Sequence, residues 1–149
     1  MRISSICSAL AGFIFLLATP AFAETPNKLE GTTLVNAKEA KEIVDSKKTA
    51  IVDTRIKVEF AEEHLPGAVN VTYGEKSAKD VNYDASKDSF DVAKLPADKS
   101  QPLLVYCNGP ECWKSYKAAK AVIKAGYKTV YWFRTGIPDW KKSGFATEK

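Results

Sequence analysis

The feature that most constrains the fold is an unbroken apolar run at residues 103–106, Leu-Leu-Val-Tyr, followed immediately by Cys107. Four consecutive apolar residues between a proline and a loop are typical of a strand that is buried on both faces, as in a parallel sheet. After the loop, the pattern predicts a helix over residues 115–125 that ends at Gly126. The run therefore indicates a strand–loop–helix unit of a parallel α/β sheet.

The rest of the chain alternates strand-like and helix-like segments in the same way. Further strands are expected at residues 50–52, 68–71 and 129–133, and further helices after the capping box Asn36–Glu39, near residues 58–64 and at residues 136–142. Residues 72–100 are polar, and we expect a surface excursion with one short helix there. The pattern predicts one α/β domain with a parallel sheet and helices on both faces.

Residues 1–23 have the pattern of a signal peptide. Arg2 precedes an apolar core at residues 9–18, and Ala21 and Ala23 place small side chains before a cut at Glu24. The core is too short to span a membrane. We therefore expect a cleaved signal peptide and an exported protein, periplasmic if the source is a Gram-negative bacterium, with no membrane span in the mature chain. Residues 24–33 are expected to form a loose N-terminal lead, and residues 34–147 the folded domain.

Composition excludes several classes of function. The chain has 22 Lys+Arg against 18 Asp+Glu, a net charge of +4 without a dense basic run, so we expect no nucleic-acid partner. One histidine excludes a His-rich metal site, and no residue requires a metal or other cofactor. Three cysteines are too few for a disulfide scaffold, but Cys107 and Cys112 remain after cleavage, in a compartment where disulfides form.

Cys107 is the candidate nucleophile. It follows a buried strand, and ligands of parallel α/β sheets bind at the C-terminal ends of strands. Loop N–H groups and the N-terminus of the next helix favour negative charge, so they would stabilise a thiolate, a persulfide or a thiophosphate. The alternative is a small buried residue that happens to be cysteine.

Four separated stretches resemble the rhodanese family, in the family's order. They are Asp53-Thr54-Arg55, similar to D-x-R; residues 63–70, EHLPGAVN, similar to GHIPGAIN; Val105-Tyr106-Cys107 with SYKAA at residues 115–119; and residues 136–140 with Gly144, similar to the family's G-G-x-x-x-W-x-x-x-G ending. The resemblance implies a single doubly wound domain with a central five-stranded parallel sheet and a cysteine that carries sulfur as a persulfide.

The loop after the cysteine departs from the family's C-x-x-G-x-R-S. The residues expected to bind the substrate here are Asn108, Gly109, Pro110, Glu111, Trp113, Lys114 and Ser115. Counted from Cys107, Cys112 takes the place of the family's arginine; counted back from Ser115, Lys114 does, in a loop that is two residues longer. Lysine lacks the guanidinium fork, so it should bind an anion more weakly. The pair Cys112-Trp113 is also similar to the end of the CxxCW motif that marks a branch of exported rhodanese-like proteins, although four residues rather than two separate the cysteines here.

Several other residues have simpler interpretations as structural residues. Asp53, Arg55 and Glu59 are expected to form an ion-pair cluster that supports the loop rather than to act on a substrate. His64 is expected to cap or pack, and Trp132 and Trp140 to lie in the core or at its rim.

Three classes of function remain. The first is an enzyme, a sulfurtransferase similar to thiosulfate sulfurtransferases, that moves sulfur from a small anion such as thiosulfate to a thiol acceptor through a Cys107 persulfide. The second is a thiol/disulfide protein, served by a redox partner protein, in which Cys112 is the resolving thiol. The third is a non-catalytic sulfur carrier or binding module. A phosphatase of related fold ranks last, because the loop lacks an arginine.

Overall fold

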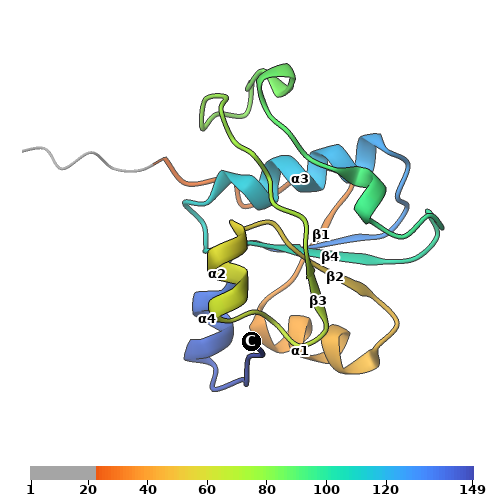
Figure 1. The fold of residues 1–149 in the computed structure, drawn as a ribbon, viewed down its shortest axis with the longest axis vertical. Coiled ribbons are helices and arrows are strands. Elements are labelled where there is room, and N and C mark those ends of the chain that lie inside the picture. The colour runs from red at the N-terminus through yellow and green to blue at the C-terminus, as the bar shows by residue number, and fades with distance from the viewer. Residues whose placement is uncertain (1–22) are drawn as a thin grey trace, which may run out of the picture.

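The computed structural model describes residues 23–149 and places five parallel strands in one sheet (Figure 1). Apart from Ala23, the predicted signal peptide lies outside the described residues. The strand order is β1-β5-β4-β2-β3, with β1 at Thr33–Leu34, β2 at Ala50–Asp53, β3 at Ala68–Asn70, β4 at Leu103–Tyr106 and β5 at Val130–Phe133. The helices are α1 (Ala37–Ser46), α2 (Lys57–Glu62), α3 (Trp113–Lys124) and α4 (Gly136–Lys142). The predicted five-stranded parallel α/β fold is confirmed.

Strand β4 lies at the centre of the sheet. It pairs in parallel with β2 on one side and with β5 on the other, and all four of its residues are fully buried. This is why its sequence is continuously apolar: side chains on both faces of a central strand meet helices.

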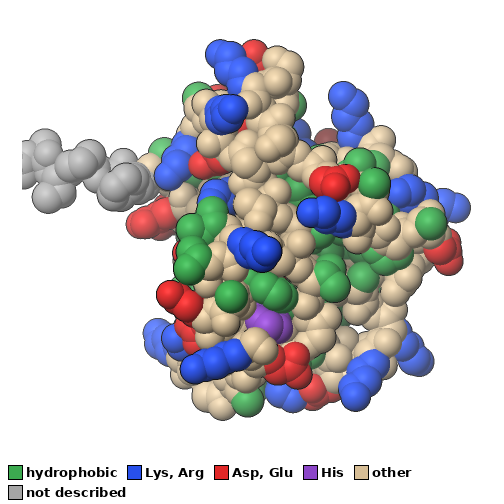
Figure 2. All heavy atoms as spheres, in the orientation of Figure 1, with side chains coloured by type: hydrophobic (Ala, Val, Ile, Leu, Met, Phe, Trp, Pro, Cys, Tyr) green, Lys and Arg blue, Asp and Glu red, His purple; other side chains and the backbone are tan. Residues whose placement is uncertain are grey.

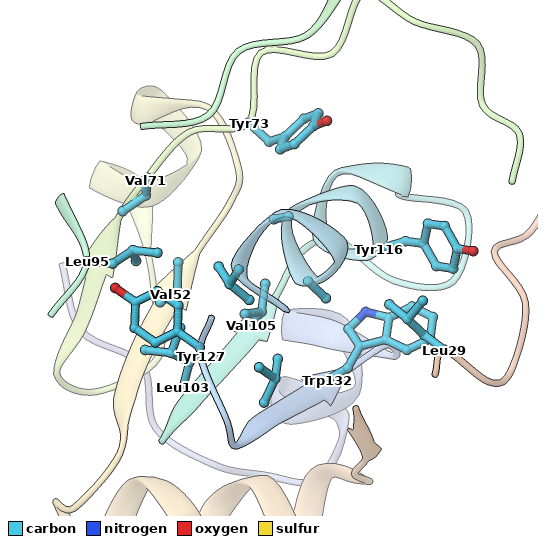
Figure 3. Close-up of a cluster of buried hydrophobic side chains, with 14 of the residues drawn as sticks. Leu29, Val52, Val71, Tyr73, Leu95, Leu103, Val105, Tyr116, Tyr127 and Trp132 are labelled. Atoms are coloured by element: carbon cyan, nitrogen blue, oxygen red, sulfur yellow. The ribbon is translucent and has the colours of Figure 1, made fainter. Parts of the chain in front are cut away.

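Helices cover both faces of the sheet, as Figure 1 shows, with α3 on one side and α1, α2 and α4 on the other. Side chains such as Val52, Val105 and Trp132 pack beneath α3 in one core (Figure 3). Leu104 and Tyr106, on the opposite face of β4, belong to a second core with α1 and α4. The alternation of the two faces along β4 thus builds both cores.

Local sequence explains the helix that follows the cysteine loop. Helix α3 begins at Trp113, two residues before the predicted start, with Cys112 as its N-cap residue. The Trp113 side chain is buried, and its ring meets the Tyr116 ring edge-on at a centroid distance of 5.2 Å. This apolar contact with the next turn extends the helix to the end of the loop.

The excursion at residues 72–100 contains two single turns of 3-10 helix, η1 (Ala85–Lys87) and η2 (Val92–Lys94), rather than the one short helix expected. Each turn begins where an aspartate side chain, of Asp84 or Asp91, accepts a hydrogen bond from the N–H two residues later. Gly74 and Ser89 exchange backbone hydrogen bonds and close the excursion at its base.

The N-terminal lead is not loose, which corrects the expectation for residues 24–33. Leu29 belongs to the core beneath α3, Thr25 is buried, and Thr33 and Leu34 form strand β1 beside β5. A single apolar side chain in a polar stretch is a weak signal, so the lead looked unstructured in the sequence. Within residues 23–149, no helix is long and apolar enough to cross a membrane.

Candidate functional site

Cys107 lies directly after β4 and is completely buried. Its carbonyl oxygen accepts a hydrogen bond of 3.1 Å from the N–H of Ile137, in the first turn of α4. Gly136 has φ +61°, and a Cβ at this position would clash with the Cys107 carbonyl group. The glycine therefore lets α4 begin against the backbone of the candidate nucleophile, and a residue with a side chain could not take its place without a clash.

A disulfide joins Cys107 to Cys112, with the two Cα atoms 6.3 Å apart. The loop between them folds back on itself: the Cys112 N–H donates to the Gly109 carbonyl oxygen at 3.0 Å, and Gly109 has φ +122°. Cys112 is partly exposed, in contrast to the fully buried Cys107. The sequence left open whether Cys112 packs into the domain or meets Cys107, and the structure has the two sulfurs bonded.

Several backbone donors of this loop have no partner within residues 23–149. The N–H groups of Asn108, Gly109 and Glu111 form no hydrogen bond with any other residue of the described chain, and no side chain caps the N-terminus of α3. Unpaired N–H groups and a helix N-terminus favour a negative charge nearby. The loop can therefore stabilise a thiolate or an anionic sulfur group.

Two of the three predicted supporting residues form a buried ion pair beneath the loop. The Asp53 carboxylate accepts hydrogen bonds from the Arg55 guanidinium, the shortest at 2.6 Å, and from the Tyr106 hydroxyl at 2.6 Å. Burial alone would lower the pKa of Arg55, but the hydrogen bond and charge of Asp53 outweigh it and raise that pKa. Burial, followed by the Asp53 charge, also raises the pKa of Tyr106. The cluster stays ionised at Arg55 and neutral at Tyr106.

The third supporting residue, Glu59, acts on the loop itself. One carboxylate oxygen accepts a 2.6 Å hydrogen bond from the side-chain amide of Asn108, and the other accepts from the Ile56 N–H at the start of α2. Glu59 forms no ion pair with Arg55, although its charge contributes to the raised pKa of that residue. The three residues therefore have two separate roles. Asp53 and Arg55 form a buried ion pair, and Glu59 joins α2 to the cysteine loop through its hydrogen bond with Asn108.

Residues 23–25, in the N-terminal segment, form hydrogen bonds with the cysteine loop and with Trp113 at the start of α3. The sequence analysis did not predict this role. The N–H and hydroxyl of Thr25 both donate to the Pro110 carbonyl oxygen at 2.8 Å. Arg134, directly after β5, donates to the Thr25 hydroxyl and carbonyl oxygens, and the Trp113 indole N–H donates to the Ala23 carbonyl oxygen. Only Arg134 could have indicated this role in the sequence, because it follows β5 as Cys107 follows β4 and therefore lies at the same edge of the sheet.

The structure brings the predicted binding residues together but orients them differently. Asn108 and Glu111 are exposed and Lys114 is partly exposed, with no ion pair to any residue between 23 and 149. Trp113 is buried, and Ser115 is buried with its hydroxyl accepting from the Trp132 indole N–H at 3.1 Å. These last two side chains hold α3 to the sheet.

A shallow pocket of about 440 Å³ opens beside Asn108. Three glutamates, at positions 59, 62 and 63, line it together with Arg55 and Lys141, and Lys141 pairs with Glu63 at 2.6 Å. Over the neighbouring α2, Figure 2 shows exposed hydrophobic side chains, and both Ile56 and Val58 are exposed. No group of three or more His, Cys, Asp or Glu side chains in residues 23–149 could hold a metal ion.

Comparisons with known proteins agree with this geometry. The family model described as a rhodanese-like domain matches residues 36–143. A thiosulfate sulfurtransferase GlpE of Coxiella burnetii is 30% identical over 103 residues, which cover 69% of this chain and 81% of that protein. Among solved structures, the rhodanese-like domain of the Anabaena sp. Alr3790 protein is 23% identical with a TM-score of 0.56, covering 80% of each chain. A polysulfide-sulfur transferase homodimer of Wolinella succinogenes is 16% identical with a TM-score of 0.56, covering 79% of each chain.

Proposed function

The chain belongs to the rhodanese-like domain family, and we propose that it is a sulfurtransferase whose Cys107 carries the transferred sulfur as a persulfide. One observation supports this above the others: Cys107 follows the central strand and enters a loop before α3 in which three N–H groups have no partner among the described residues. The distant thiosulfate sulfurtransferase relative points to the same reaction.

Thiosulfate illustrates the reaction. The Cys107 thiolate attacks the outer sulfur, the bond between the two sulfurs of thiosulfate breaks, and sulfite leaves with the electron pair. The outer sulfur stays on Cys107 as a persulfide, and its charge is held by the N–H groups of the loop. An acceptor thiolate then attacks the outer persulfide sulfur, and the Cys107 thiolate is released for the next cycle.

The disulfide makes this reaction depend on reduction. A sulfur bonded to Cys112 is not a thiolate, so the oxidised protein cannot start the cycle. A dithiol reductant, supplied by a redox partner protein, would have to open the bond first. The predicted signal peptide supports export, to a compartment where such disulfides form.

The same disulfide favours a second candidate function, a thiol/disulfide redox protein that carries no sulfane sulfur. The two candidates differ in the product on the protein. A sulfurtransferase gains the mass of one sulfur atom from its donor. A thiol/disulfide redox protein changes in mass only by the two hydrogens that it loses when the disulfide forms and regains when the disulfide is reduced.

Intact mass spectrometry of the purified protein separates them, after incubation with thiosulfate in the presence and absence of a reductant. We expect sulfite release by the reduced wild-type protein and none by the oxidised form. Cys107→Ser should reduce sulfite release, and thiocyanate formation with cyanide as acceptor, to the background rate. Its thermal midpoint should be compared with that of the reduced wild type, because a disulfide alters stability. Near-wild-type turnover in Cys107→Ser would refute the mechanism.

A further inference from the structure

We propose that Cys112 gives the protein a second activity, the reduction of the bound sulfane sulfur to sulfide, and this rests on the Cys107 persulfide proposed above. A persulfide has two sulfurs, and the inner one is the Cys107 sulfur itself. The disulfide places the Cys112 sulfur in bonding contact with that atom. The folded chain can therefore bring an internal thiolate to the inner sulfur.

The position of Cys112 suits it to act as a thiolate. It is the N-cap residue of α3, a helix of 12 residues, and its side chain makes no capping hydrogen bond. The N–H groups and dipole at a helix N-terminus stabilise a thiolate. The 6.3 Å between the Cα atoms lies within the ordinary range for a disulfide, so the backbone need not move for the two sulfurs to meet.

Burial favours Cys112 over an external thiol at the inner sulfur. Cys107 is completely enclosed, by the end of β4 and by the start of α4. Cys112 is tethered to the same short loop, and a tethered nucleophile acts at a high effective concentration. Attack on the inner sulfur should therefore be intramolecular, whereas external acceptors are limited to the outer sulfur.

The chemistry balances without an outside oxidant. The Cys112 thiolate forms a bond to the inner sulfur, the bond between the two persulfide sulfurs breaks, and the outer sulfur leaves with the electron pair as hydrosulfide. The sulfane sulfur gains two electrons, and the two cysteines lose two as they form the disulfide. With thiosulfate as donor, one thiosulfate and two protein thiols give one sulfite, one hydrogen sulfide and one disulfide.

The unequal exposure of Cys107 and Cys112 also determines which sulfur an external reductant attacks when it reduces the disulfide. Cys112 is partly exposed and Cys107 is fully buried, so an external dithiol should attack the disulfide at the Cys112 sulfur. Attack at Cys112 releases Cys107 as a thiolate into the loop with the unpaired N–H groups. The second thiol of the reductant then frees Cys112, and both cysteines are ready for another thiosulfate.

A single-turnover experiment tests the second activity. Wild type and Cys112→Ser are reduced, freed of reductant without air, and mixed with thiosulfate; sulfite, sulfide and intact mass are then measured. We expect about one equivalent of sulfide per wild-type chain and the loss of two hydrogens from the protein. Cys112→Ser should release sulfite but at least about tenfold less sulfide, and it should retain one added sulfur. Serine is a favoured N-cap residue, so α3 should persist in the variant.

The outcomes separate this inference from the proposed function. If wild type and Cys112→Ser both release sulfite and keep a stable persulfide, the sulfurtransferase stands and the reduction is refuted. Equal sulfide from both proteins also refutes it, because Cys112 is then not the reductant. If neither protein releases sulfite, both proposals fail.

Discussion

Two irregular segments border helix α3, and they differ in what surrounds their polar groups. The loop at residues 107–112 precedes the N-terminus of the helix and leaves the N–H groups of Asn108, Gly109 and Glu111 unpaired within the described chain. The excursion at residues 72–100 lies along α3 in Figure 1 and pairs several of its polar side chains with its own backbone and with the helix. Both segments are held by other parts of the fold, but only the loop carries a cysteine and ends at the N-terminus of a helix.

A buried ionic cluster fixes the excursion to α3. Lys117 is fully buried, and its ammonium lies 2.9 Å from a carboxylate oxygen of Glu75, 3.7 Å from Asp88 and 2.8 Å from the Ser77 hydroxyl. The Asp88 carboxylate accepts four hydrogen bonds, from the Tyr73 and Ser77 hydroxyls and the N–H groups of residues 76 and 77. This cluster stabilises the fold, and none of its members is a cysteine.

The contrast shows how a reactive loop differs from a structural one in the same molecule. In the excursion, the carboxylates of Glu75 and Asp88 are paired with the buried Lys117 of α3, so substitutions there should change stability. In the cysteine loop, donors are held in place by residues outside it, such as Thr25 and Glu59, and remain free. Substitutions there should change sulfur chemistry first. Three further predictions test this division.

The largest effect on stability is expected for Lys117→Ala. The change leaves the carboxylates of Glu75 and Asp88 buried without their cation, and breaking a buried pair costs about 3–5 kcal/mol. Denaturant unfolding should show this loss. Lys124→Ala, at the exposed last position of the same helix, is the matched control and should lower stability by no more than about 1 kcal/mol, the value of a cation near a helix C-terminus. Sulfur transfer per folded molecule should be unchanged in both variants, and a large loss of turnover in folded Lys117→Ala would break the division.

A smaller effect on stability is expected at low pH, where the Asp88 carboxylate becomes protonated. Burial alone would raise the pKa of Asp88, but its hydrogen bonds, led by that of the Ser77 hydroxyl, outweigh burial and hold the pKa well below the usual range. A carboxylate with a lowered folded pKa contributes stability above its unfolded pKa of about 3.9, and this contribution is lost as the pH falls through the folded value. The free energy of unfolding should therefore decline below about pH 4.

Asp88→Asn tests the origin of this decline. The asparagine has no charge to lose, so its free energy of unfolding should fall less steeply with acid than that of the wild type. Asp45→Asn, at an exposed carboxylate of α1, should keep the wild-type slope. Identical slopes for all three proteins would show that the excursion does not govern the acid response.

The sequence predicted the loop better than the excursion, for a physical reason. Strand β4, Cys107 and the start of α4 depend on local apolar runs and on glycine geometry, which are visible within a few residues. Lys117 looks like an ordinary exposed helix charge, because its partners Glu75 and Asp88 are distant in the chain. The contact between Thr25 and Pro110 joins residues 85 positions apart, and no local pattern marks it.

The smallest effect, and the sharpest contrast with Lys117, is expected for Lys114. This residue lies in the first turn of α3, is partly exposed and has no ion pair within the described chain. A screened surface charge is worth about 0.5–1 kcal/mol, so Lys114→Ala should raise the KM for thiosulfate about two- to fivefold and weaken its salt dependence. Lys114→Arg should preserve or lower the KM, since the charge is kept and a fork is added.

We expect Lys114→Ala to raise the free energy of unfolding, the opposite of the effect of Lys117→Ala. A positive charge near a helix N-terminus opposes the helix dipole, so its removal in Lys114→Ala should stabilise the protein by about 0.3–1 kcal/mol while it weakens substrate binding. Two lysines of one helix would then have opposite effects: loss of Lys117 lowers stability and spares turnover, whereas loss of Lys114 raises stability slightly and raises the KM. Thermal unfolding and thiosulfate kinetics on both alanine variants measure this directly. If Lys114→Ala leaves the KM unchanged, the loop N–H groups bind the anion without a side-chain cation, and the contrast between the two lysines is one of stability alone.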